Sequence, residues 1–231
     1  FRRVLFRSKE RLEKAGYGED ILTIRQMNFA DIDQIAREAG PFDFVLADLG
    51  VSSMQIDNPE RGFTYKKEGP LDLRLNPQKG VSAAERLKEV TEEELAGMLW
   101  ENSDEPYAEE IAATVMEKLR KGEPVETTIQ LQKAIEEALS FLPEREQKEA
   151  VKKSCQRTFQ ALRIDVNSEF EVLYAFMEKL PATLAPGGRV AILTFHSGED
   201  RIVKKAFKEL KRAGIYSEIA QDVIRPSAEE C

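Results

Sequence analysis

The sequence predicts an α/β protein whose parallel sheet is interrupted by an all-helical segment. Short apolar runs alternate with helical patterns before residue 80 and after residue 154, which is typical of parallel sheets. The part between them shows helical patterns only. It also carries the acidic excess: residues 81–153 hold 18 acidic and 10 basic side chains, whereas the rest of the chain has 24 of each.

The expected elements begin in the N-terminal part. Ile21–Met27 is predicted to form a strand, and Asp31–Ala39 a short helix that ends at Gly40. Phe42–Ala47 is an almost continuous apolar run, which indicates a buried strand.

Three capping boxes predict helix starts in the middle part. Such a box lets a side chain and a backbone donor satisfy each other at the first turn. The motifs are Ser82-x-x-Glu85, Thr91-x-x-Glu94 and Thr127-x-x-Gln130. We expect the Glu-rich positions here to be solvated helix faces rather than a partner site.

The C-terminal part returns to the alternating pattern. Val172–Leu184 is predicted to be a helix stopped at Pro186-Gly187-Gly188, followed by a strand over Arg189–Phe195 and a helix over Glu199–Arg212. The chain therefore divides into a discontinuous sheet domain, residues 1–79 and 152–231, and a helical insertion, residues 80–151.

Both ends are expected to be incomplete. Phe1–Ser8 has no clean helix or strand period, and Ser227 would cap a helix that stops at once. A complete doubly wound domain would open with a strand and a glycine-rich turn, yet the chain contains no G-x-G-x-x-G. We therefore expect a first strand and glycine loop to be missing upstream.

Composition excludes several classes of protein. With 42% hydrophobic and 33% charged residues the chain is expected to fold, and no apolar run approaches the roughly 18–20 residues of a membrane span. No signal-peptide pattern opens it, so a cytoplasmic location is expected. Cys155, Cys231 and a single His196 make a structural metal improbable. A net charge of −8 argues against coating nucleic acid by charge alone.

Polar side chains follow two of the predicted strands. Ligands of open α/β sheets bind outside the carboxyl ends of the strands. Phe42–Ala47 leads to Asp48, Ser52 and Ser53, and Arg189–Phe195 leads to His196 and Ser197. Asp48 could instead cap a turn, and His196 could be a satisfied core or capping residue, but the crowding of polar groups favours an enzyme cleft.

Arginine-rich motifs provide candidate contacts to phosphate. Arg74 ends a long polar loop that begins at Asp57, and Arg157 and Arg163 lie on the polar side of a predicted helix. Ion pairs of Arg157 and Arg163 with Asp165 or Glu169 fit the spacing equally well.

The last predicted helix carries a basic face. Its members are Arg201, Lys204, Lys205, Lys208, Lys211 and Arg212. A solvated helix face is the usual interpretation of such a pattern, and an RNA-facing surface is the alternative.

Together these constellations resemble the RsmH/MraW family, the S-adenosylmethionine-dependent methyltransferases that modify N4 of a cytosine in small-subunit (16S) ribosomal RNA. The resemblance runs from about Lys9 to Lys208. It is carried by Asp48-Leu49-Gly50-Val51-Ser52-Ser53-Met54-Gln55, Glu60-Arg61-Gly62-Phe63, Gly69-Pro70-Leu71-Asp72, Arg157-Thr158-Phe159-Gln160-Ala161-Leu162-Arg163-Ile164 and Phe195-His196-Ser197.

The resemblance implies a Rossmann-like methyltransferase sheet with a helical insertion, S-adenosyl-L-methionine as cofactor, and small-subunit ribosomal RNA or the small ribosomal subunit as partner. It implies cofactor contacts at Phe29, Asp48 and Gln55. On this hypothesis Asp48 lies between the cofactor and the target amine. Ser52 and Ser53 would shape the base pocket, which His196 and Ser197 would close. Arg74, Arg157, Arg163 and Arg201 would bind phosphate or lock loops.

Departures from the family pattern indicate a divergent branch. The family's Thr-Leu-Gly-Gly-Gly-Gly-His-type loop is absent, so we expect weak cofactor binding by the chain as it stands. Asn102-Ser103-Asp104-Glu105 replaces Tyr-Gly-Glu-Glu, Ser154-Cys155-Gln156 replaces His-Pro-Ala, and Gly198 replaces Leu. The alternatives are a non-catalytic RNA-binding or ribosome-assembly protein on the same fold and a nucleotide-dependent dehydrogenase.

Overall fold

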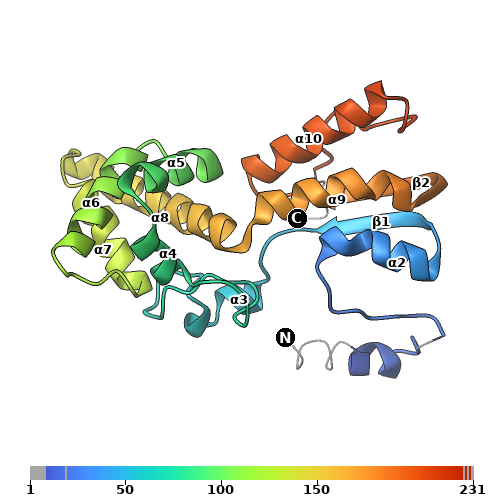
Figure 1. Ribbon diagram of the computed structural model, residues 1–231, viewed down its shortest axis with the longest axis horizontal. Coiled ribbons are helices and arrows are strands. Elements are labelled where there is room, and N and C mark those ends of the chain that lie inside the picture. The colour runs from blue at the N-terminus through green and yellow to red at the C-terminus, as the bar shows by residue number, and fades with distance from the viewer. Residues whose placement is uncertain (1–8, 19, 226, 228, 230–231) are drawn as a thin grey trace.

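The computed structural model describes residues 9–18, 20–225, 227 and 229. Figure 1 shows a helical bundle beside a small α/β layer, joined where α8 (Glu144–Asn167) runs into α9 (Glu169–Thr183). The stretch Phe1–Ser8 and most of the helix start expected at Ser227 lie outside the described residues. None of the helices within the described ranges combines the length and the apolar character that crossing a membrane requires.

In the described part of the chain two parallel strands form the sheet, which confirms the predicted α/β class. β1 (Phe42–Asp48) pairs with β2 (Leu184–Leu193) in a register that runs from Phe44 opposite Arg189 to Asp48 opposite Leu193. The predicted stop at Pro186-Gly187-Gly188 is wrong, because this tripeptide lies inside β2. The register shifts there, so the proline and the two glycines form an irregularity in the strand rather than the end of α9.

Only one face of this sheet is covered within the described residues. Val45 and Ala47 of β1 and Val190 and Ile192 of β2 pack on the apolar core of α9. Side chains of a strand alternate between faces, and on the other face Phe44 and Leu46 are 57% and 59% exposed. The strand expected over Phe42–Ala47 therefore exists, but it is not buried on both sides.

The predicted strand over Ile21–Met27 is wrong. This segment is irregular and leads into a 3-10 turn, η1 (Phe29–Asp31), and then into α2 (Ile32–Ala39), the helix that ends at Gly40 as predicted. A strand requires a neighbour to accept its backbone hydrogen bonds, and within the described residues β1 pairs only with β2.

The C-terminal helix of the layer is α10 (Ser197–Arg212), which packs on α9. It begins two residues earlier than predicted, because the His196 side chain caps it by accepting the backbone N–H of Glu199. β2 accordingly ends at Leu193 rather than at Phe195.

The bundle contains the helices predicted for the middle part. They are α4 (Ala83–Glu89), α5 (Glu92–Ser103), α6 (Ala108–Arg120), α7 (Thr128–Ala138) and most of α8. The three predicted capping boxes are present at the starts of α4, α5 and α7. Buried leucine and isoleucine side chains fill the core, among them Leu99, Ile111, Leu131 and Ile135.

The loop between β1 and the bundle packs on the bundle. It contains α3 (Ser53–Ile56) and the 3-10 turn η2 (Pro59–Arg61). Leu71 and Leu73 from this loop, together with Phe159 and Leu162 of α8, belong to the bundle core. The division at residues 80–151 stays a prediction, and the bundle draws core residues from both sides of it.

Candidate functional site

The carboxyl ends of β1 and β2 meet at one edge of the sheet. Asp48 pairs with Leu193, and the N–H of Leu49 donates to the Leu193 carbonyl oxygen at 3.3 Å. Two residues further on, Phe195 lies over Gly50, where an added Cβ would come 3.5 Å from its ring. The segments that carry Asp48 and His196 therefore leave neighbouring strands at the same edge.

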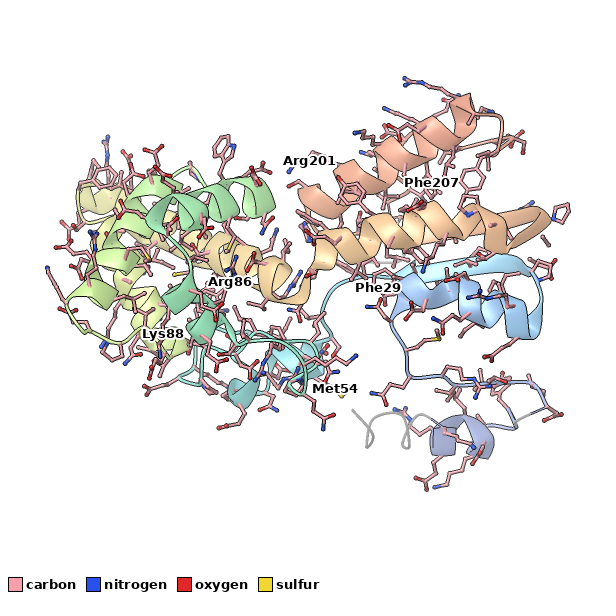
Figure 2. The ribbon with its side chains drawn as sticks, in the orientation of Figure 1. Phe29, Met54, Arg86, Lys88, Arg201 and Phe207 are labelled. Atoms are coloured by element: carbon pink, nitrogen blue, oxygen red, sulfur yellow. The ribbon has the colours of Figure 1, made fainter. Side chains whose placement is uncertain are left out.

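A pocket of about 280 Å³ lies beside Asp48. Its walls are mainly apolar and come from η1, α2, β1 and α9. They are Met27, Asn28, Phe29, Ile32, Ile35, residues 45–49 and Phe176. The rings of Phe29 and Phe176 meet edge to face, with their centroids 5.3 Å apart. Figure 2 shows Phe29 between α2 and α9.

The polar groups of this pocket are few. Asn28 is already engaged, because its side-chain oxygen accepts the N–H of Ala30. The Asp48 side chain is exposed, and no hydrogen bond or ion pair engages it among the described residues. A pocket with aromatic and aliphatic walls and a single open carboxylate suits a flat apolar group that bears a cation or a hydrogen-bond donor.

Gln55 does not line this pocket. Its side-chain oxygen accepts the backbone N–H of Ser52 at 2.9 Å and the Ser52 hydroxyl at 3.1 Å, which closes the first turn of α3. Ser52 and Ser53 are exposed at the start of that helix. The structure therefore places Phe29 and Asp48 together, whereas Gln55, Ser52 and Ser53 form a separate turn that follows β1.

His196 lies in a different environment from Asp48. Its side chain is 10% exposed and packs near Phe170, with the ring centroids 6.0 Å apart. Its Nδ1 accepts the backbone N–H of Glu199 at 3.4 Å, and its Nε2 lies 3.3 Å from Glu199 Oε1 without forming a well-aligned hydrogen bond. His196 therefore acts here as the cap of α10.

Glu199 is the buried carboxylate of this cap. Its Oε2 accepts the N–H of Phe195 at 2.9 Å. Burial raises the pKa of the Glu199 carboxyl. The contacts with His196 and Phe195 and the charge of Arg163 oppose burial and leave the pKa below its usual range.

Glu169, His196 and Glu199 present three possible metal-ligand atoms within 4.8 Å of one another. Arg163, however, holds both oxygens of Glu169, at 2.8 and 2.9 Å. In neutral His196 the accepting Nδ1 leaves the ring proton on Nε2, which then cannot bind a metal. This cluster suits an ion-pair network better than a metal centre.

Ser197 and Arg201 both contact Asp104. The Ser197 hydroxyl donates to Asp104 Oδ2 at 3.1 Å, and Arg201 Nη1 lies 3.2 and 3.1 Å from the two carboxylate oxygens. Asp104 follows α5 in a left-handed conformation, with φ of 52°. It therefore links the bundle to the first turn of α10.

The four candidate arginines fall into two groups. Arg74 forms a two-point ion pair with Asp72, in which Nε and Nη2 each lie 2.8 Å from an oxygen, and Arg163 pairs with Glu169 in the same way. Both lock local structure. Arg157 is half-buried and forms no hydrogen bond or ion pair in the described ranges, and Arg201 is 57% exposed.

Asp104 and Phe176 were not among the predicted site residues. Asp104 lies in the stretch that departs from the family pattern, and that departure was the available signal. Phe176 forms part of the pocket wall but is spaced like any core residue of an amphipathic helix, so its sequence context carried no such signal.

Comparison with known proteins gives one family. The family model described as the MraW methylase family matches residues 2–230. The chain is 66% identical over 227 residues to "Ribosomal RNA small subunit methyltransferase H 1" of Lachnoclostridium phytofermentans, which covers 98% of this chain and 62% of that protein. It is 66% identical over 225 residues to the protein of the same name from Agathobacter rectalis, covering 97% of this chain and 64% of that protein. The chain thus spans less than two thirds of the length of these relatives.

Proposed function

The chain belongs to the MraW methylase family, and on this premise we propose that its protein transfers a methyl group from S-adenosylmethionine to the N4 amine of a cytidine in small-subunit ribosomal RNA. The observation that carries this proposal is the pocket at the end of β1, where Asp48 and Phe29 lie together. The names of the relatives favour methyl transfer over a dehydrogenase or a non-catalytic RNA-binding protein.

The residues of the pocket suit part of the proposed methyl donor. Phe29, Phe176 and Ile32 offer apolar surface to a flat adenine ring, and Asp48 offers a negative charge. A volume of about 280 Å³ is just below the usual range for such sites, so this pocket would hold a portion of the molecule. When bound, the donor supplies an electrophilic methyl group.

Asp48 is the residue that we assign to the chemistry. An exocyclic cytosine amine is a poor nucleophile because its lone pair is delocalised into the ring. A carboxylate that accepts the amine hydrogens would orient the nitrogen, and orientation of this kind can supply a large part of a rate enhancement. The target base must leave its stack for this purpose.

Supporting roles follow from the positions of the other strand-end residues. The exposed hydroxyls of Ser52 and Ser53 follow Asp48 and would contact the extruded base. His196 would act as a positioning residue, because it caps α10, the helix that begins with Ser197. Arg157 and Arg201 remain the proposed contacts to RNA, whereas Arg74 and Arg163 would hold the loop and the helix junction in place.

The test compares two aspartates of the same strand in the full-length protein. Asp48→Asn keeps the shape of the side chain but removes its charge. It should reduce methyl transfer to small-subunit ribosomal RNA about 100-fold, because a misplaced nucleophile can lower a rate by about that factor. Transfer of a labelled methyl group, followed by mass spectrometry of the RNA, measures both rate and position.

The matched control is Asp43→Asn, which alters an exposed aspartate near the other end of β1. Its rate should equal that of the wild type. Equal rates for the wild type and Asp48→Asn would remove Asp48 from the mechanism. Methylation at an atom other than cytidine N4 would refute the proposed reaction.

A further inference from the structure

The outward face of α10 carries a basic stripe, which we define as Arg201, Lys204, Lys205, Lys208 and Arg212. These residues follow one another at spacings of one to four along the chain, and all lie on one side of the helix. The opposite side packs on α9 through Ile202, Val203 and Phe207. Figure 2 shows Phe207 on the side of α10 that faces α9 and Arg201 at the amino end of the helix.

The stripe is open to solvent. Its five basic side chains and Glu209 line a hollow of about 410 Å³, and all six residues are exposed. Lys204 pairs with Asp200 at 2.9 Å and Arg201 pairs with Asp104. Lys205, Lys208 and Arg212 form no ion pair or hydrogen bond in the part of the chain that the structure describes.

This arrangement costs the helix stability. Like charges four residues apart on a helix repel each other, and the stripe contains three such pairs: Arg201 with Lys205, Lys204 with Lys208, and Lys208 with Arg212. It also stands out in a chain whose net charge is −8. A bound polyanion would turn this repulsion into attraction.

The stripe leads away from the candidate site. α10 begins directly after the carboxyl end of β2, next to the strand end that carries Asp48. From Arg201 to Arg212 the helix rises about 16 Å, at about 1.5 Å per residue. An RNA strand that places one base beside Asp48 could therefore continue along the basic stripe.

We propose that the basic stripe of α10 binds the phosphate backbone of single-stranded RNA next to the target nucleotide. This inference rests on the proposed function for its substrate. It assigns to the stripe the electrostatic part of RNA binding, for which an acidic chain needs a local basic surface. The salt dependence of binding follows directly, because each neutralised phosphate releases counterions.

The experiment measures binding of a fluorescein-labelled single-stranded RNA by anisotropy, over a series of KCl concentrations and without cofactor. The variant is Lys205→Gln, Lys208→Gln and Arg212→Gln in the full-length protein. A plot of the logarithm of the association constant against the logarithm of the salt concentration has a negative slope. Each lost phosphate contact makes this slope about 0.7 less steep, so the triple variant should have a slope about 2 less steep than that of the wild type. For equal affinities at about 1 M KCl, where phosphate contacts contribute little, this slope difference makes the variant bind about 100-fold more weakly at about 0.1 M KCl.

The control removes three other exposed charges, with Lys148→Gln, Lys152→Gln and Lys153→Gln on α8. Its slope should equal that of the wild type. Equal slopes for the two triple variants, or wild-type RNA binding without salt dependence, would overturn the proposal. Equally tight binding of poly-glutamate to the wild type would also overturn it, in favour of an acidic protein partner.

Failure of this inference is distinguishable from failure of the proposed function. RNA binding that needs the stripe, in a wild-type protein that transfers no methyl group, would support the stripe and refute the methyltransferase. Methyl transfer by the wild type, together with unchanged RNA binding in the stripe variant, would support the methyltransferase and refute the stripe.

Discussion

At the scale of single residues, Gly62 shows how tightly the loop after β1 is packed. It is buried and has a φ of 71°, a conformation that favours glycine. A Cβ at this position would run into the carbonyl oxygen of Pro70 and come within 2.9 Å of the Asp72 nitrogen. The neighbouring Arg61 donates to the carbonyl oxygens of Arg74 and Leu75, at 2.7 and 3.0 Å. The Glu60-Arg61-Gly62-Phe63 motif thus builds a loop.

Gly62→Ala should lower the free energy of unfolding by about 3 kcal/mol, because the left-handed conformation and the contact with backbone atoms both disfavour a side chain. Gly122→Ala is the matched control, since Gly122 has a φ of 78° and open space around it. Its cost should be about 1 kcal/mol. Urea denaturation measures both values, and equal losses would contradict the packing explanation.

At the scale of elements, the first turn of α10 depends on reciprocal capping. The His196 side chain accepts the N–H of Glu199, and the Glu199 carboxylate accepts the N–H of Phe195. The same carboxylate lies near the amino end of the helix, where the helix dipole favours a negative charge. The polar residues His196 and Glu199 after β2 therefore orient α10 in addition to lying at a candidate site.

Acid should weaken this turn. The pKa of Glu199 is lower in the folded chain than in the unfolded chain, so its contribution to stability is complete above about pH 5 and is lost as the pH falls through the folded value. Between about pH 5 and pH 3, the free energy of unfolding of Glu199→Gln should therefore decrease less than that of the wild type. Urea denaturation over a pH series tests this, with the exposed Glu109→Gln as control. Parallel curves for the wild type and Glu199→Gln would contradict it.

At the scale of the whole molecule, two apolar cores lie side by side. Leu131 belongs to the core of the bundle and Leu180 to that of the α/β layer, and both are fully buried. The continuous run from α8 into α9 connects the two parts (Figure 1). The contacts of Asp104 with Ser197 and Arg201 connect them as well. Because none of the described residues belongs to both cores, the two parts should open separately.

Leu131→Ala and Leu180→Ala test this separation, because the first alters only the core of the bundle and the second only the core of the α/β layer. Each should cost about 2–5 kcal/mol in its own core. Native-state hydrogen exchange should show faster exchange for α5, α6 and α7 in Leu131→Ala, and for β2, α9 and α10 in Leu180→Ala. A uniform loss of protection throughout the chain in both variants would show a single cooperative unit instead.

The sequence by itself determined the features that depend on local patterns. The starts of α4, α5 and α7 follow from side chains within one turn, and the α/β class follows from the spacing of apolar residues. The family follows from short motifs such as Phe195-His196-Ser197, in which neighbours along the chain carry the information.

Only the tertiary structure decided which groups meet and which stay free. Whether Ile21–Met27 becomes a strand depends on a pairing partner. The spacing left Asp165 and Glu169 open as partners of Arg163, and the fold gives Glu169 to Arg163 and Asp165 to Arg86. The same holds for Asp104, 93 residues from Ser197 along the chain but in contact with it. Pairing and charge neutralisation act through space, so the order of residues alone does not specify them.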